Sequence, residues 1–152
     1  MSEHLTIAEA AARCGLPEST LRYWERIGLL SPVRREPSSH HRRYSDADVA
    51  RLETLANLRA VGLSIEDMRA YFDGSSLGDA SAGQQRALFQ AHSDRIRAEI
   101  DAMNTRLAYL DLKVAYWTAR ESGDSEAASA IADELAQVIR RINPNRSEKE
   151  HA

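Results

Sequence analysis

Residues 20–30 read TLRYWERIGLL, and this stretch decides the fold of the N-terminal half. The run from Arg22 to Trp24 precedes Gly28, which predicts a short helix that ends at the glycine. Pro32 and an arginine-rich segment follow. This order is typical of a helix that enters a DNA groove, followed by a loop or wing that contacts the DNA backbone.

A second short helix is predicted directly before this one. Thr6 and Glu9 have the spacing of a capping box, which predicts a helix that begins after the threonine and ends at Gly15. Pro17 is tolerated only at a helix start, so we expect the next helix over 18–27. Two short helices joined by a tight turn make a helix-turn-helix.

The region after this pair contains a further loop and two more helices. Residues 31–44 show no helical period, and their prolines and serines predict a loop or a two-stranded wing. Capping patterns at Ser45 and Ser64 predict helices that begin there. Residues 74–83 are rich in glycine and serine and are predicted to be a linker, which leaves 1–73 as the first domain.

The clearest periodicity lies in the C-terminal half, where apolar residues alternate by four and three. It predicts a helix over 84–120, and the seam alone spans roughly 43 Å at 1.5 Å per residue. A four-helix domain of this size cannot cover such a rod, so we expect the same helix from a second chain to cover it. The expected dimerisation residues are Phe89, Ile96, Ile100, Met103, Leu107, Leu110, Val114 and Trp117, with Ser93 in the same row.

The rest of the sequence limits the class of protein to which this chain can belong. A last amphipathic helix is predicted over 121–143, and the polar residues 144–152 are expected to form a flexible tail. No apolar run is long enough to cross a bilayer, and no signal-peptide pattern opens the chain. The lone cysteine, Cys14, has no internal disulfide partner, so we expect a cytoplasmic protein.

Charge is unevenly distributed along the chain. The net charge of −3 is unusual for a nucleic-acid binder, but residues 34–43 hold four arginines, two histidines and one glutamate. Arginine suits two-pronged contacts with phosphate and guanine. His40 and His41 are expected to be solvated, because no cysteine or carboxylate has the spacing of a further metal ligand.

Together these motifs resemble the mercury-resistance regulator (MerR) family of bacterial transcription factors. The resemblance implies an all-α fold with a small β wing. It comprises a winged helix-turn-helix domain, a long dimerisation helix in an antiparallel coiled coil, and a short C-terminal helix. The pattern departs at His40-His41, where the family has Gly-Tyr. The matching residues are Thr6-Ile7, Gly15, Thr20 to Glu25, Gly28-Leu29-Leu30, Pro32, Arg42, Tyr44, Asp48-Val49, Leu52 and Gly62-Leu63-Ser64.

The resemblance also implies how DNA is bound. The helix over 18–27 would lie in the major groove, and Arg42 and Tyr44 would contact phosphates, which position a protein without reading sequence. A homodimer would bind a pseudo-palindromic promoter site in double-stranded DNA and distort it, so that the elements contacted by RNA polymerase realign. The implied DNA-binding residues are Thr20, Arg22, Tyr23, Arg26, Arg34, Arg42 and Tyr44.

The sequence leaves open which effector the protein responds to and whether it activates or represses transcription. Metal-responsive members of the family hold cysteines around the long helix, and this chain has none there. An aromatic set either lines a small pocket for an organic effector or belongs to the dimer core. An architectural DNA-binding protein or an effector-independent repressor is the alternative. No catalytic grouping, phosphate loop or metal cluster occurs, so we expect no enzyme, cofactor or metal. The candidate effector residues are Tyr71, Tyr109, Tyr116 and Trp117.

Overall fold

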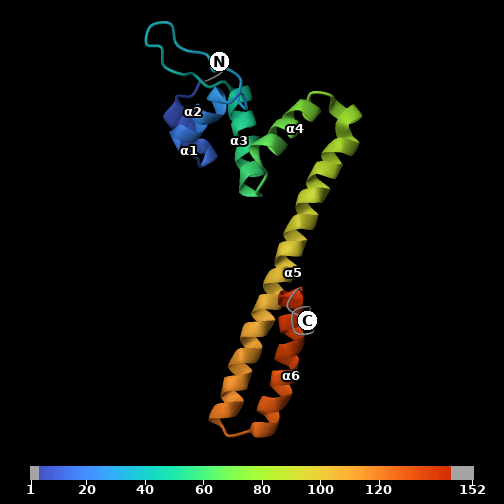
Figure 1. Cartoon of the computed structure of the whole chain (residues 1–152). Coiled ribbons are helices and arrows are strands. Elements are labelled where there is room, and N and C mark those ends of the chain that lie inside the picture. The colour runs from blue at the N-terminus through green and yellow to red at the C-terminus, as the bar shows by residue number, and fades with distance from the viewer. Residues whose placement is uncertain (1–3, 145–152) are drawn as a thin grey trace, which may run out of the picture. The chain divides into compact units, whose positions relative to one another are not determined.

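The computed structural model of this chain describes residues 4–144 (Figure 1). The chain divides into two compact units, one up to Phe89 and the other from Gln90 onward. The longest helix, α5 (Ala82–Glu121), therefore begins in the first unit and continues through the second.

The first unit is a cluster of short helices, and its predicted caps are confirmed. The hydroxyls of Thr6, Ser45 and Ser64 each accept a hydrogen bond from the backbone amide three residues further on. Such a bond satisfies one of the amides that a helix start leaves without a partner. The elements before α5 are α1 (Ile7–Cys14), α2 (Glu18–Arg26), α3 (Asp46–Ala60), α4 (Ile65–Ser75) and a 3-10 turn, η1 (Gly78–Ser81).

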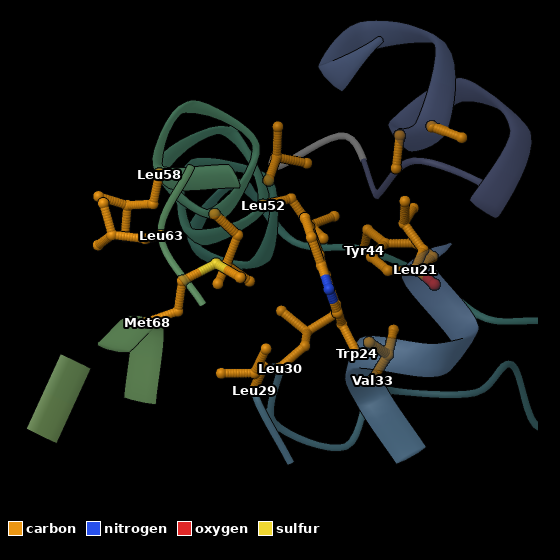
Figure 2. Packing of buried hydrophobic residues seen from close by; sticks show 14 residues of the cluster. Leu21, Trp24, Leu29, Leu30, Val33, Tyr44, Leu52, Leu58, Leu63 and Met68 are labelled. Carbon is orange, nitrogen blue, oxygen red and sulfur yellow. The ribbon is translucent and has the colours of Figure 1, made fainter. Parts of the chain in front are cut away.

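One apolar core joins these helices (Figure 2). Leu21 and Trp24 of α2 are almost completely buried, as their spacing predicts, and they share the core with Leu52 of α3. Burial of each such side chain contributes roughly 1.5–3 kcal/mol. The two residues that lie between Leu21 and Trp24, Arg22 and Tyr23, are consequently directed to solvent.

The β wing expected between α2 and α3 does not form a sheet in the part of the chain that the structure describes. Residues 31–44 run as a loop with sparse pairing. Pro37 has no amide to donate, and His40 has a left-handed φ of 56°, so regular extended pairing cannot continue through the tip. The pairing consists of the bridges Leu5–Tyr44 and Arg35–Arg42 and of backbone hydrogen bonds from Arg43 to Arg34 and from Glu36 to His41.

The segment predicted as a linker is folded by its own small residues. Its first two residues complete α4, and η1 follows before α5 begins. The buried hydroxyl of Ser81 lies 2.6 Å from the Gly74 carbonyl oxygen, and the side-chain amide of Gln85 donates to the Tyr71 carbonyl at 2.8 Å. These bonds satisfy carbonyls at the end of α4, where the helix itself supplies no donors.

The second unit is a helical hairpin (Figure 1), in which α6 (Ser125–Ile142) returns beside α5. Gly123 turns the chain with a φ of 74°, and the Asp124 carboxylate then caps α6 through the Ala127 amide. Ala119, Ala128 and Leu135 are buried in this hairpin.

Helix ends agree closely with the periodicity, since α5 begins two residues before the predicted start at 84. No helix among residues 4–144 is long and apolar enough to span a membrane. The tail predicted over 144–152 lies, from residue 145 onward, outside the described residues.

Candidate nucleic-acid interface

The exposed face of α2 gathers two cations and an aromatic ring. Arg22 and Arg26 are four residues apart and so lie on one side of the helix. The Arg26 guanidinium lies 5.3 Å from the centre of the Tyr23 ring, a cation–π distance, and the Tyr23 side chain is 39% exposed. Glu18 pairs with Arg22 at 2.9 Å across one helical turn, while Thr20 is half-buried.

Arg42, predicted to contact phosphate, is bound by a carboxylate from α2. Its Nε and Nη2 donate to the two Glu25 oxygens at 3.0 and 3.3 Å, and both side chains are largely buried. The hydrogen bond to Glu25 raises the pKa of Arg42 above its ordinary value. The pair fixes the end of the arginine-rich loop to α2.

Tyr44 corrects the sequence interpretation. It was expected at a phosphate, but the side chain is 0% exposed and its hydroxyl has no hydrogen-bond partner among the described residues. Burial, with Glu25 nearby, raises the pKa of Tyr44 to about 12. A phenol held in the core cannot reach DNA, so in this structure Tyr44 anchors the loop through its ring and its backbone pairing with Leu5.

A basic hollow of about 330 Å³ lies along the loop, lined in part by the exposed Arg34 and Arg35. Arg43 pairs with Glu36 at 2.9 Å, and this hydrogen bond, with that from Ser39, lowers the pKa of Glu36. The carboxylate therefore stays ionised and offsets the charge of Arg43, and Arg35 donates to the His40 carbonyl oxygen at 3.3 Å. Arg34 lies exposed beside them and is directed to solvent.

Two arginines that sequence reasoning missed hold the end of α2. Arg51 of α3 donates through Nε to the Leu29 carbonyl at 2.8 Å, and its guanidinium lies 3.9 Å from the centre of the Phe72 ring. Arg69 of α4 donates to the Ile27 carbonyl. The end of α2 and the turn after it leave the carbonyls of Ile27 and Leu29 without a helical partner, and these two side chains supply donors. No sequence signal identified them, because the acceptors are brought close only by the tertiary fold.

The candidate effector residues fall in both units. Tyr71 packs edge-on against Phe72 and Phe89, at 5.2 and 5.7 Å between ring centres, within the first unit. In the second unit Tyr116 packs edge-on against Trp117 at 5.3 Å. The structure therefore has a three-ring cluster on α4 and α5 and a separate pair of rings on α5, and a shared effector pocket stays a prediction.

Cys14 is half-buried near the turn that joins α1 to α2. Burial and then the Glu53 carboxylate raise the pKa of its thiol, and the neighbouring Arg13 opposes them only partly. The thiol is therefore protonated at neutral pH and weakly nucleophilic. Within residues 4–144, no three histidine, cysteine or acidic side chains are grouped to hold a metal ion.

The apolar seam of α5 is open to solvent in the single chain. Its residues range from 38% exposed at Phe89 to 68% at Val114, and Trp117 is 61% exposed. Two half-buried apolar residues of the same helix, Tyr109 and Leu112, lie outside the seam. Soluble chains rarely leave so large a continuous apolar row uncovered unless a partner covers it.

Two family models match this chain: MerR helix-turn-helix regulatory protein over residues 5–75, and MerR DNA binding over 49–112. The chain is 34% identical over 111 residues to the transcriptional regulator HmrR of Rhizobium leguminosarum, covering 72% of this chain and 73% of HmrR. It is 35% identical over 92 residues to the regulator AdhR of Bacillus subtilis, covering 60% and 65%.

Solved structures agree with the sequence relatives. HiNmlR, a MerR family regulator lacking the sensor domain and bound to promoter DNA, aligns with a TM-score of 0.59 at 27% identity, over 84% of this chain and 95% of that one. A putative MerR family regulator from Listeria monocytogenes aligns with a TM-score of 0.60 at 28% identity, over 86% and 98%.

Proposed function

This chain belongs to the MerR family of DNA-binding transcriptional regulators, and from that premise we propose that it is a homodimer that distorts a pseudo-palindromic promoter site. DNA binding and transcription regulation are properties of the family. The dimer, the distortion of DNA and the effector are specific to this proposal. The observation that carries it is the combination of a cationic face on α2 with an uncovered apolar seam on α5.

Base reading is assigned to α2. Arg22 and Tyr23 reach base edges or phosphates in the major groove, with Thr20 and Arg26 beside them. An arginine can donate two hydrogen bonds to a single guanine, which gives discrimination that a phosphate contact lacks. Only Nη2 of Arg22 is paired with Glu18, so the guanidinium keeps other N–H groups for this contact. The exposed pair with Glu18 contributes little, so releasing it as well would cost little.

Phosphate binding is assigned to the arginine-rich loop. Arg34 is exposed beside the basic hollow, which suits a contact with the DNA backbone. Arg42 has N–H groups beyond the two that Glu25 binds, because a guanidinium carries five. We therefore keep Arg42 as a phosphate contact whose position is set by Glu25.

Dimerisation follows from the seam on α5. Two chains joined along this helix hold two α2 helices at a fixed separation, which matches the two half-sites of a pseudo-palindrome. A promoter whose half-sites are spaced differently has to bend or twist to engage both, and the contacts offset the cost of deformation. Such a distortion is how we propose that the protein presents promoter elements to RNA polymerase in the cytoplasm. We assign it no catalytic activity.

The effector is the least constrained part of the proposal. The Tyr116–Trp117 pair supports a small organic ligand, because two rings packed edge-on at the C-terminal end of the seam offer an aromatic surface. An architectural protein or an effector-independent repressor has the same DNA-binding parts. Transcription in vitro from the selected promoter, with and without a panel of small organic compounds, separates these cases.

Selection of bound sequences from a random pool of duplex DNA tests the core of the proposal. We expect a pseudo-palindromic consensus, bound by two chains per duplex in sedimentation, with a change in duplex bending measured by energy transfer between end labels. A single half-site bound by one chain would contradict the proposal.

A further inference from the structure

A small hollow of about 140 Å³ lies in the second unit, between the middle of α5 and the last turn of α6. The C-terminal end of α6 lies beside α5 at this level (Figure 1). The walls are formed by Ala102, Thr105 and Arg106 of α5 and by Arg141 and Ile142 of α6. The hollow therefore combines two cations with a largely apolar lining.

The two guanidinium groups of the hollow have no ion pair with a carboxylate among residues 4–144. No acidic residue stands three or four positions from Arg106 or from Arg141, so neither can find a carboxylate along its own helix. Arg97 of the same α5, by contrast, pairs with Asp94 at 3.0 Å. The positive charge at the hollow is therefore not neutralised by the surrounding side chains.

The dipole of α6 accounts for one of these cations but not for both. Arg141 is in the last turn of α6, where a cation is favoured because the helix end carries about half a negative charge. Arg106 lies in the interior of α5, far from either end of that helix. Two full positive charges exceed the partial charge of one helix end, so the hollow is electropositive and suits an anion.

We propose that this hollow binds a small organic anion, with its carboxylate between Arg106 and Arg141 and its apolar part against the aliphatic side chains of the lining. The inference rests on the proposed function only where it makes this ligand the effector of the regulator. Arg106 lies about 15 Å along α5 from Tyr116, at 1.5 Å per residue, so the site is separate from the Tyr116–Trp117 pair.

The size of the hollow limits the ligand. Pockets for drug-sized molecules measure about 300–1,000 Å³, which is well above its volume. An apolar cavity of about 150 Å³ holds a benzene molecule, so a body of at most one ring fits here. Ala102 and Ile142 offer no polar side-chain atoms to the ligand. The lining therefore favours a carboxylate on a compact apolar body over a bare inorganic anion.

Guanidinium groups suit the charged end of such a ligand. Each is planar and can donate two parallel hydrogen bonds to one carboxylate. The Thr105 hydroxyl donates to the Asp101 carbonyl oxygen at 3.0 Å, so its only proton is engaged. We therefore assign the recognition of charge to the two arginines, whereas Thr105 forms part of the wall.

A ligand at this place would hold the weakly packed end of the hairpin. Ala128 and Leu135 of α6 are buried, but no residue of the helix after Leu135 is, and Ile142 is 36% exposed. A ligand that contacts both helices binds the closed hairpin better than an open one, so it stabilises the closed form. The last turn of α6 is thus the element through which the ligand acts.

Calorimetric titration of the full-length protein tests the site with three probes. Benzoate has a carboxylate on one ring, benzamide has nearly the same shape without the charge, and inorganic phosphate has charge without the ring. We expect benzoate to bind once per chain and about tenfold more tightly than either other probe. No binding of benzoate at millimolar concentration overturns the site. Equal binding of benzamide overturns the role of the arginines, and equal binding of phosphate overturns the apolar part.

Substitutions of single arginines locate the ligand. Arg106→Gln and Arg141→Gln should each weaken benzoate binding by about tenfold, as for the loss of a charged hydrogen-bond partner. The matched control is Arg140→Gln, which removes the same charge from the same turn but does not line the hollow, and it should bind benzoate with native affinity. Equal weakening by all three variants would mean that overall charge attracts the anion, and it overturns the site. Thermal unfolding establishes that each variant is folded.

Hydrogen exchange and transcription separate the site from the proposed function. With benzoate bound, backbone amides at the C-terminal end of α6 should exchange several-fold more slowly in the native protein and not in Arg141→Gln. Unchanged exchange overturns the closing of the hairpin. Binding of benzoate that leaves transcription from the selected promoter unchanged overturns the effector role alone. Failure of the protein to bind any duplex DNA overturns the proposed function, whereas the calorimetric result for the site still stands.

Discussion

Arg42 and Glu25 form a two-armed ion pair, with Nε–Oε2 at 3.0 Å and Nη2–Oε1 at 3.3 Å, between the arginine-rich loop and α2. Their side chains are only 22% and 15% exposed. A charge left in such a place without its partner is costly. The orientation of the loop is therefore coupled to that of the helix proposed to read bases.

The first prediction concerns this pair. Glu25→Ala should lower the free energy of unfolding by about 2 kcal/mol, because a largely buried guanidinium loses its charged partner. DNA affinity should fall as well, although removing a carboxylate would otherwise favour binding to DNA. Thermal unfolding and fluorescence anisotropy measure the two effects. Glu18→Ala, which removes an exposed carboxylate from the same helix, should change stability by about 0.5 kcal/mol or less.

The second prediction separates base reading by α2 from phosphate binding by the arginine-rich loop. Arg34→Ala should weaken binding about equally on operator and random DNA, and it should lower the salt slope by roughly 1, as for one lost phosphate contact. Arg22→Ala should instead reduce the ratio of operator to random affinity. Titrations at several salt concentrations on both DNAs measure these quantities. Equal losses on both DNAs from Arg22→Ala would mean that α2 does not read bases.

Sequence reasoning succeeded where the determinants are local. The caps at Thr6, Ser45 and Ser64 involve groups three residues apart, so their spacing in the sequence was sufficient. The seam on α5 was equally visible, because helical periodicity does not depend on the rest of the fold.

The remaining features depend on tertiary position. An arginine followed two residues later by a tyrosine reads the same whether the phenol faces DNA or, as for Tyr44, the core. Arg51 and Arg69 find their acceptors, the carbonyls of Leu29 and Ile27, only after three helices have packed. No local pattern carries that information.

The third prediction tests the burial of Tyr44. Its hydroxyl has no hydrogen-bond partner among the described residues, so Tyr44→Phe should leave stability at neutral pH unchanged or slightly higher. DNA affinity should also be unchanged. A clear loss of affinity without loss of stability would restore the phosphate contact first expected for this residue.

Alkaline pH extends this test. The pKa of Tyr44 is raised to about 12 in the fold, above the usual value near 10. The neutral phenol is therefore favoured by folding, and its contribution to stability is complete below pH ~10 and lost as pH rises through the folded value. Denaturant unfolding between pH ~9.5 and ~12 should show a decline that is smaller in Tyr44→Phe.

The fourth prediction concerns dimerisation. Leu107→Glu places a charge in the proposed seam, where desolvation without a partner is strongly unfavourable, so the variant should be monomeric. Operator binding should be lost with it, because both half-sites need a chain. Light scattering measures the mass. Ala108→Glu, which adds the same charge at the adjacent exposed position, should stay dimeric. A dimer of unchanged affinity from Leu107→Glu would mean that the seam is not the interface.

The last prediction concerns the signal, for which Cys14 is the only thiol in the chain. Burial and Glu53 raise the pKa of the thiol, so at neutral pH it lacks the nucleophilic thiolate that reacts with oxidants and aldehydes. Its place at the C-terminal end of α1 disfavours a thiolate further, because the helix dipole is negative there. A soft metal needs several such ligands, and one cysteine per chain supplies too few.

We therefore expect the native protein and Cys14→Ser to behave alike in promoter transcription, with or without oxidant, aldehyde or divalent metal. A response of the native protein that Cys14→Ser abolishes would assign sensing to the thiol. Where neither protein responds, Tyr116 and Trp117, at the C-terminal end of the seam, become the next site to probe. Fluorescence recorded in a Trp24→Phe background, which leaves Trp117 as the one tryptophan, then provides the readout. An organic ligand stacked on that ring changes its emission, and Trp117→Phe should abolish binding of the same ligand.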